Sequence, residues 1–247
     1  MQLKEGGNIF KDQDGKIVTQ RINRADVDGT LQWLEKITGL PHVDNKLGTT
    51  GLKTTSGDLD IAVNQEDISK KELVDRLTDW CIKNNQDPKQ WIAKTGISVH
   101  FKTPIKGNVD NGFVQTDLMF GNPDWMKWSL RGASGDSPFK GVHKHILLAS
   151  IAKAKGMKWS ANKGLLRRSD NSIISNNPQE IAKLLIGPTI QADDLESVET
   201  IWTVIKNQPD QQKLTQDARD QFAKDNLTLP EMQDIHLMRK LAGYEMV

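Results

Sequence analysis

The chain has 247 residues, of which 33 are Lys or Arg and 32 are Asp or Glu, so its net charge is +1. The hydrophobic fraction is 36% and the mean hydropathy −0.55, and no stretch approaches the roughly 18 apolar residues of a membrane-spanning helix. These values exclude a helical membrane protein. A nearly neutral chain is also atypical of proteins that bind long nucleic acids through overall charge, and the length allows one ordinary domain or two small ones.

Targeting and redox features favour the cytoplasm. The N-terminal stretch MQLKEGGNIFKDQDGK carries charges and glycines where a signal peptide would need an apolar segment, so we expect no export. Cys81 is the only cysteine and cannot form a disulfide within the chain, so we expect a buried thiol. The compact size suggests a phage or other mobile-element source, in which case the location would be the host cytoplasm.

The first 44 residues are expected to form an arm and a helix. Residues 1–22 contain two glycine turns and no residues with an evident chemical role, which predicts an extended arm that packs on the domain or a partner. Residues 23–38 predict a helix, because apolar residues recur at helical spacing after Asp26, a candidate cap. Gly39 and Pro41 are expected to end it.

Residues 47–63, LGTTGLKTTSGDLDIAV, combine a Gly/Thr-rich loop with two aspartates. Side chains alternate along a strand, so Asp58 and Asp60 share one face while Leu59 and Ile61 face the core. Two adjacent carboxylates repel each other, and a divalent cation such as Mg²⁺ with substrate phosphates would relieve this. The alternative is a polar turn before a strand with two exposed acids. The loop offers an anion N–H groups and hydroxyls from Gly48, Thr49, Thr50, Gly51, Thr54, Thr55, Ser56 and Gly57.

A third acid, Asp117, lies within a later apolar segment, where an acid is uncommon unless it is paired or binds a metal. Its alternative interpretation is a structural aspartate in a salt bridge. Residues 97–101 alternate as a half-buried strand and residues 113–120 return after a turn. This hairpin would place Asp117 beside the first acidic strand. His100 faces away from the apolar side, so we expect a surface histidine.

Two further helices are predicted. Residues 69–72 form a capping-box pattern that opens a helix ending near residue 84. Residues 143–156 predict another helix, with its basic residues at the ends and on the outer face. The segment 139–168 carries eight Lys or Arg and no acid.

The last 59 residues, 189–247, look helical and acidic. An apolar stripe at helical spacing indicates core or a surface for a protein partner. A last segment after Leu229-Pro230 carries a second set of apolar residues. The stripe comprises Leu195, Val198, Trp202 and Ile205, and the second set comprises Met232, Ile235, Leu237, Met238 and Leu241.

The motif S56-G57-D58-L59-D60 followed by Asp117 resembles the nucleotidyltransferase superfamily, and specifically the catalytic core of the DNA polymerase X (DNA polymerase beta-like) family. The similarity continues in order through residues 151–157, IAKAKGM, a strand segment at 160–165 and a helix from Pro178 to Gly187-Pro188. It covers about residues 45–188. Helix-hairpin-helix elements, which usually precede this core in the family, have no counterpart here.

The resemblance implies an α+β fold in which a mixed sheet is flanked by helices, followed by a basic second subdomain and a helical extension. The expected divisions are 1–44, 45–137, 138–188 and 189–247. It implies that Asp58, Asp60 and Asp117 hold two Mg²⁺ ions, or Mn²⁺, with Asp117 near the attacking group. The family's loop arginine has no clear counterpart. The nucleotide contacts that we expect are Gly48, Thr49, Lys53, Ser56, Gly57, Arg131, Lys144 and His145.

The implied activity is transfer of a nucleoside monophosphate from an NTP or dNTP to a nucleic-acid 3′ end, with release of pyrophosphate. Two alternatives stay open. One is transfer to a protein, a tRNA or a small molecule, which the near-zero net charge and the missing DNA-binding modules favour. The other is a catalytically idle scaffold that retains the fold.

Overall fold

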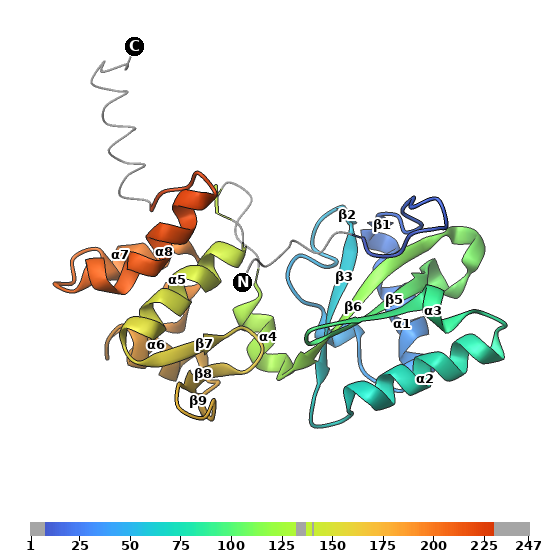
Figure 1. Ribbon diagram of the computed structural model, residues 1–247, viewed down its shortest axis with the longest axis horizontal. Helices are drawn as coiled ribbons and strands as arrows, with labels where there is room; N and C mark the ends of the chain where they lie inside the picture. Colours follow the sequence, from blue (N-terminus) through green and yellow to red (C-terminus); the bar gives the residue numbers. More distant parts are fainter. Residues whose placement is uncertain (1–7, 132–136, 140, 230–247) are drawn as a thin grey trace, which may run out of the picture. The chain divides into compact units, whose positions relative to one another are not determined.

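The structure is a computed structural model that describes residues 8–131, 137–139 and 141–229. It divides into two compact units, Met1–Lys127 and Trp128–Val247, and the boundary falls within helix α4 (Pro123–Ser129) (Figure 1). The expected arm and most of the expected core lie in the first unit. The finer four-part division stays a prediction, and the apolar set predicted at 232–241 lies outside the described residues.

A four-stranded mixed sheet forms the centre of the first unit, in the order β3-β6-β5-β4 (Figure 1). Strand β3 (Asp58–Asn64) is parallel to β6 (Phe113–Gly121), which is antiparallel to β5 (Ser98–Pro104), and β5 is antiparallel to β4 (Ile92–Thr95). The predicted hairpin between residues 97 and 120 is therefore confirmed, and it places β6 directly beside β3.

Helices cover one face of this sheet and bury its apolar side chains. Helix α1 (Arg24–Thr38), α2 (Lys70–Lys83) and the short α3 (Pro88–Trp91) contribute to one core with the alternate residues of the strands. Leu59, Ile61 and Val63 of β3 belong to this core, so the opposite face of the strand carries the acids. The mixed α and β fold with helices flanking the sheet is confirmed.

The local sequence explains where the helices of the first unit begin and end. Gly39 ends α1 in the left-handed conformation at φ 70°, and Ser69 caps α2 by accepting a hydrogen bond from the Glu72 backbone N–H. The cap predicted at Asp26 is wrong. The N-cap position belongs to Asn23, and Asp26 lies in the first turn, where its carboxylate pairs with Lys106 Nζ at 2.5 Å.

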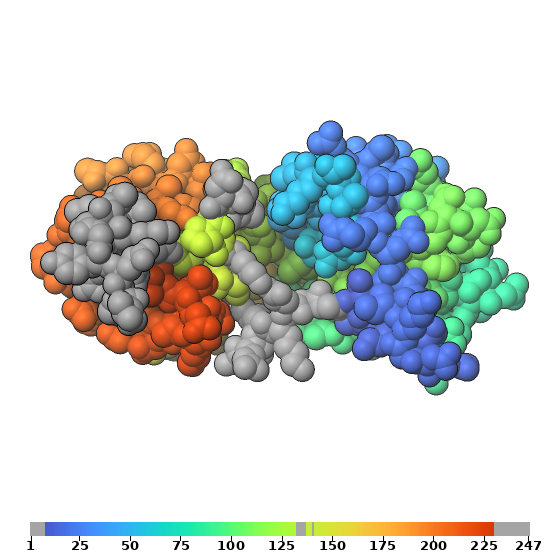
Figure 2. Space-filling view, turned by 90° about the horizontal axis from the view of Figure 1, so that it is seen from above, coloured from blue at the N-terminus to red at the C-terminus, as the bar shows by residue number. Residues whose placement is uncertain are grey.

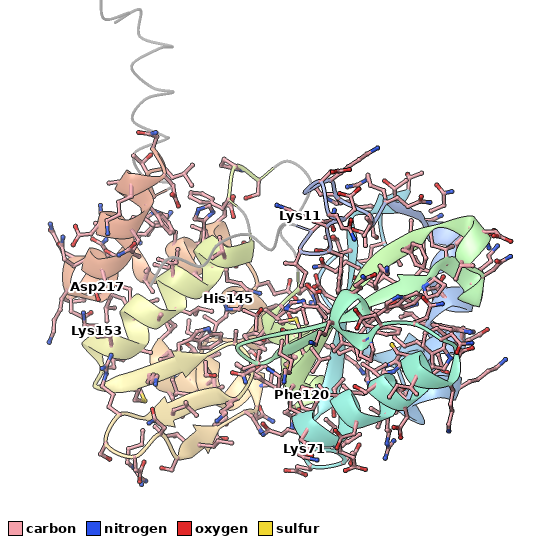
Figure 3. All side chains as sticks on the ribbon, turned by 45° about the vertical axis from the view of Figure 1, so that its right-hand side comes forward. Lys11, Lys71, Phe120, His145, Lys153 and Asp217 are labelled. Atoms are coloured by element: carbon pink, nitrogen blue, oxygen red, sulfur yellow. The ribbon has the colours of Figure 1, made fainter. Side chains whose placement is uncertain are left out.

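The second unit packs helices around a three-stranded antiparallel sheet, β7-β8-β9 (Figure 1). Its strands are β7 (Met157–Ser160), β8 (Gly164–Arg167) and β9 (Ile173–Ser175), and its helices are α5 (Gly141–Ala154), α6 (Pro178–Leu185), α7 (Val198–Ile205) and α8 (Gln211–Lys224). Helices α5 and α8 lie against each other, and Lys153 pairs with Asp217 across them (Figure 3).

One expectation about the second unit is wrong. The basic residues of α5 were expected on its ends and outer face, yet His143 and Lys144 are buried because α5 is enclosed by its neighbours. The apolar stripe at 195–205 was expected to be core or a surface for a protein partner, and its residues are buried in the core of the unit. Cys81, in the first unit, is a buried free thiol as expected.

Short elements complete the described chain. Strands β1 (Ile22–Asn23) and β2 (Thr55–Ser56) form a small antiparallel pair, and the 3-10 helices η1 to η4 span Val43–Asn45, Ile105–Gly107, Val109–Asn111 and Ala192–Leu195. No helix in the described ranges is both long and apolar enough to cross a membrane.

Candidate active site

Three carboxylates converge on the face of the sheet opposite the core. The ladder pairs Asp60 of β3 directly with Asp117 of β6, and Asp58 lies two residues before Asp60 on the same face. One carboxylate oxygen of each residue lies within 4.8 Å of the others. The prediction that Asp117 lies beside the first acidic strand is thus confirmed, and the parallel pairing explains why residues far apart in the chain meet.

Burial and mutual repulsion disfavour the ionised forms of Asp58 and Asp60. Burial, followed by the charges of Asp58 and Asp117, raises the pKa of Asp60 to about 7. Burial and the charge of Asp117 also raise the pKa of Asp58, although Arg21 opposes this. Among the described residues, no ion pair within 4.0 Å joins Asp58 or Asp60 to a Lys, Arg or His.

These carboxylates fit a divalent metal ion. Their donors are hard oxygens, they come from rigid strands, and in the described part of the chain none of the three forms an ion pair with a Lys or Arg. Asp117 has an ion-pair partner in His100, but no Lys or Arg partner among the described residues. This contact is of the kind that the structural interpretation of Asp117 expects, so the role of Asp117 as a metal ligand stays a prediction.

His100 is not the surface histidine that the alternation predicted. It does face away from the core, but its position on β5 is directly opposite Asp117, and the side chain is buried in the acidic face. Its Nδ1 lies 2.6 Å from Asp117 Oδ1. Gln115, two residues before Asp117, donates from Nε2 to the same oxygen at 3.0 Å. Pattern reasoning missed both residues, and only the β5–β6 register could have revealed them.

The glycine-rich loop is anchored to the backbone of Asp60. The Leu47 N–H donates to the Asp60 carbonyl at 2.8 Å, and the Asp60 N–H donates to Thr50 Oγ1 at 3.0 Å. Gly48 and Gly51 adopt φ values of 57° and 75°, which let the chain turn sharply between these anchors. The loop therefore holds Gly48 and its neighbour Thr49 close to the acidic strand, whereas Lys53 is exposed.

A basic residue that the sequence did not indicate lies at the end of this loop. Strand β1 pairs with β2, so the arm and the loop lie side by side at the surface of the first unit, in dark and lighter blue (Figure 2). Arg21 donates from Nε to Thr55 Oγ1 at 3.0 Å and from Nη2 to the Thr55 carbonyl at 3.2 Å. Its Nη1 lies 3.1 Å from the point where a Cβ on Gly57 would be.

Ser56 and Gly57 complete this end of the loop. The Ser56 hydroxyl is buried and has no hydrogen-bond partner among the described residues. Because Gly57 has no side chain, the Arg21 guanidinium can approach the backbone directly before Asp58. Arg21 belongs to the arm, so the arm places a basic side chain close enough to Asp58 for its charge to lower the pKa of that acid.

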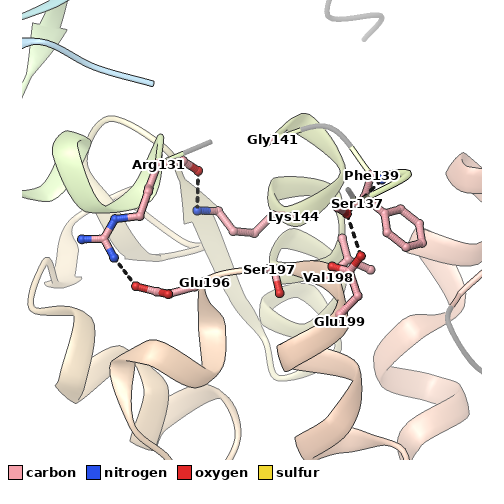
Figure 4. Close-up of a pocket in the computed structure, with 9 residues that line it drawn as sticks. All are labelled: Arg131, Ser137, Phe139, Gly141, Lys144, Glu196, Ser197, Val198 and Glu199. Atoms are coloured by element: carbon pink, nitrogen blue, oxygen red, sulfur yellow. Dashed lines mark hydrogen bonds and ion pairs between the residues drawn. The ribbon is translucent and has the colours of Figure 1, made fainter. Parts of the chain in front are cut away.

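The other expected nucleotide contacts belong to the second unit. Arg131 pairs with Glu196, and Lys144 donates from Nζ to the Arg131 carbonyl at 3.4 Å, on the wall of a small pocket (Figure 4). Burial, followed by the charge of Arg131, lowers the pKa of Lys144 to about 8. His145 accepts a hydrogen bond from Trp159 Nε1 at 3.0 Å, and burial lowers its pKa to about 3, so its imidazole is neutral at pH 7.

Comparison with known proteins identifies no relative by sequence. No protein-family description and no curated protein matches the chain. Among solved structures, the chain is similar to Leishmania infantum polymerase beta in a ternary P/T complex, with a TM-score of 0.42 and 10% sequence identity. The match covers 73% of this chain and 78% of that chain. So distant a likeness says nothing about the reaction, and the expected location and mobile-element source stay predictions.

Proposed function

We propose that the protein is a metal-dependent nucleotidyltransferase that transfers a nucleoside monophosphate from an NTP or dNTP to the 3′ hydroxyl of a nucleic acid. The observation that carries this proposal is the convergence of Asp58, Asp60 and Asp117 within 4.8 Å beside a loop suited to phosphate. In the reaction, the acceptor oxygen forms a bond to the α-phosphorus and the bond to the bridging oxygen breaks. Pyrophosphate leaves, and the acceptor hydroxyl loses its proton.

Asp58, Asp60 and Asp117 would hold two divalent cations, Mg²⁺ or Mn²⁺. When bound, such ions make the attacking hydroxyl more acidic and neutralise the charge that develops on pyrophosphate. The protein contributes a rigid arrangement of ligands, because two of the acids lie on β3 and the third on its hydrogen-bonded neighbour β6. The raised pKa of Asp60 supports the proposal, since a cation would relieve the repulsion that raises it.

The triphosphate would lie along the glycine loop of the first unit. Gly48, Thr49, Ser56 and Gly57 supply N–H groups or hydroxyls, and no group of the described residues competes with a phosphate oxygen for the buried Ser56 hydroxyl. Arg21 would supply the charge that the expected loop arginine does not, because a guanidinium pairs well with phosphate. Lys53 is a further candidate for a phosphate contact, and we keep Arg131, Lys144 and His145 of the second unit as proposed nucleotide contacts.

Exposed basic side chains of the second unit favour a nucleic acid as the acceptor. Most of the basic residues in segment 139–168 are exposed, on α5, β7 and β8 and in the adjoining turns: Lys153, Lys155, Lys158, Lys163, Arg167 and Arg168. A local basic surface binds phosphates even where the whole chain is nearly neutral. This surface predicts an affinity for oligonucleotides that falls steeply as salt rises.

Labelled nucleotides test the proposal. The protein is incubated with Mg²⁺ or Mn²⁺, single-stranded, primed and tRNA acceptors, and NTPs or dNTPs labelled at either the α or the γ phosphate. We expect the α label to reach an acceptor and the γ label to leave as pyrophosphate, with both lost in Asp58→Asn/Asp60→Asn. Transfer that survives in this variant, or no transfer to any acceptor, would overturn the proposal. Labelling of a protein or small molecule instead would overturn only the nucleic-acid acceptor.

A further inference from the structure

The two oxygens of Asp117 have different surroundings. Oδ1 lies 2.6 Å from His100 Nδ1 and 3.0 Å from Gln115 Nε2. A carboxylate can only accept hydrogen bonds, so an ionised Asp117 requires that His100 carry a proton on Nδ1 and donate it. Oδ1 then has two donors. Oδ2 has no hydrogen bond among the described residues.

Both donors are held in place by the fold. His100 lies directly opposite Asp117 in the antiparallel β5–β6 ladder, and its side chain is 11% exposed. Gln115 is buried, and its Oε1 accepts a hydrogen bond from the Ile9 backbone N–H at 2.9 Å. This bond fixes which end of the Gln115 amide points at Asp117, because the amide N must then face the carboxylate. Neither donor can turn away from Oδ1 without losing a buried hydrogen bond.

We propose that His100 is a positioning residue for the metal centre. Together with Gln115 it occupies Oδ1 of Asp117 and leaves Oδ2 alone to bind a divalent cation. This inference rests on the metal site of the proposed function and adds the manner in which Asp117 binds. A carboxylate that offers one oxygen suits Mg²⁺, which demands near-octahedral geometry, whereas the larger Ca²⁺ accepts bidentate carboxylates. His100 therefore favours Mg²⁺ over Ca²⁺.

Substitutions of His100 can test its hydrogen bond to Asp117 separately from its other contacts. His100 Nε2 is buried and has no hydrogen-bond partner among the described residues, so only Nδ1 contributes a bond. In His100→Asn the side-chain amide N can take the place of Nδ1 and donate to Asp117, and nothing is lost at Nε2. Leu has the same branched skeleton of four side-chain heavy atoms as Asn, so His100→Leu keeps this shape but has no donor. The pair of variants therefore separates the hydrogen bond from simple filling of the site.

The measurement is direct binding of Mn²⁺ by the full chain, read from the electron paramagnetic resonance signal of free Mn²⁺, without nucleotide or acceptor. Loss of a residue that orients a metal ligand commonly weakens binding about 10- to 100-fold. We expect a rise of about tenfold or more in the Kd of His100→Leu, and a Kd within about threefold of the original protein for His100→Asn. Competition with Mg²⁺ and Ca²⁺ should show reduced preference for Mg²⁺ in His100→Leu only.

The outcomes separate this inference from the proposed function. If the original protein binds Mn²⁺ no better than Asp58→Asn/Asp60→Asn, the metal site itself fails and the role of His100 fails with it. If the original protein binds Mn²⁺ and His100→Leu binds it equally well, only the positioning role is overturned. Equal losses in both His100 variants would also overturn it, provided that their melting temperatures with chelator match that of the original protein.

Discussion

Asp60 of β3 and Asp117 of β6 are paired residue to residue in a parallel ladder, and His100 of β5 continues the row on the far side of Asp117. Strands β3, β6 and β5 therefore each place one ionisable side chain in the same row across the sheet. The two acids repel each other, whereas the histidine is hydrogen-bonded to the second of them. This row costs stability in the free protein, which is typical of sites organised for a ligand.

Replacing Asp60 with Asn should change stability and activity in opposite directions. The substitution removes a buried carboxylate whose charge is disfavoured by burial and by Asp58 and Asp117. We expect the free energy of unfolding, measured in chelator at pH 7.5, to rise by roughly 1 kcal/mol, while nucleotidyl transfer falls at least about 100-fold. Asp75→Asn is the control, because Asp75 is exposed and its ion pair is with the exposed Lys71. A stability loss in Asp60→Asn would contradict this account.

The free energy of unfolding should depend on pH through the titration of Asp60. Its pKa is about 7 in the folded protein and close to 3.8 when unfolded, so the folded state binds more protons between these values. The free energy of unfolding therefore falls as pH rises from about 4 to 7, by at most about 1.4 kcal/mol per pH unit. Buried His42, whose pKa is about 4, acts in the opposite direction up to its ordinary value of 6.5.

Because these contributions partly cancel, the informative quantity is the difference between the original protein and Asp60→Asn, measured by urea unfolding at several pH values in chelator. The contribution of His42 is the same in both proteins, so it cancels in the difference between their free energies of unfolding. We expect the advantage of the Asn variant to grow between pH 4 and 7 and to vanish when saturating Mg²⁺ is added to the original protein. A constant difference across this range would show that Asp60 titrates normally.

The sequence predicted the parts of this site that depend on local pattern. Alternation along 58–63 placed Asp58 and Asp60 opposite the core, and the 97–120 hairpin brought Asp117 to them. Local pattern could not show that His100 is covered, since that depends on the strand register. It also could not place Arg21, because the pairing of β1 with β2 joins segments distant in sequence.

Lys144 illustrates the same limit in the second unit. The sequence suggested a surface charge, because a lysine within a helix usually lies on the solvent side, but the burial of α5 depends on the helices that enclose it. Its side chain reaches the Arg131 carbonyl and lies over the Trp128 ring, with Nζ 5.6 Å from the ring centroid. Amphipathic periodicity cannot predict such an environment for a cation.

Lys144→Met should stabilise the protein and weaken nucleotide use. Burial disfavours the charged amine, and Met has a similar length without that cost, so we expect a gain of roughly 1 kcal/mol at pH 7. If Lys144 contacts nucleotide as proposed, kcat/KM should fall about tenfold, which corresponds to one ordinary charged contact. Lys183→Met is the control, because Lys183 is exposed on α6 and lies outside the basic segment 139–168. Unchanged kcat/KM would remove Lys144 from the proposed site.

Arg21 should determine affinity for the triphosphate. Its guanidinium is held by two bonds to Thr55, so it is oriented before a ligand arrives. We expect Arg21→Ala to raise the KM for nucleotide about 10- to 100-fold with a smaller effect on kcat, because the lost contact is with bound phosphate. Arg21→Lys should recover only part of the affinity, since an ammonium cannot reproduce the planar fork. Arg76→Lys is the matched control, because Arg76 contacts Glu72 and the Thr38 carbonyl instead of the loop.

Gly57→Ala tests the proposed contact of Arg21 with the triphosphate by displacing the guanidinium. A Cβ at this position would lie 3.1 Å from Arg21 Nη1, so the guanidinium must shift, while the backbone at Gly57 needs no left-handed conformation. We therefore expect a higher KM for nucleotide with little change in melting temperature. Combining Gly57→Ala with Arg21→Ala should add little to the effect of Arg21→Ala alone, because both act on one contact. Fully additive effects would show that Gly57 acts through its own backbone N–H and not through Arg21.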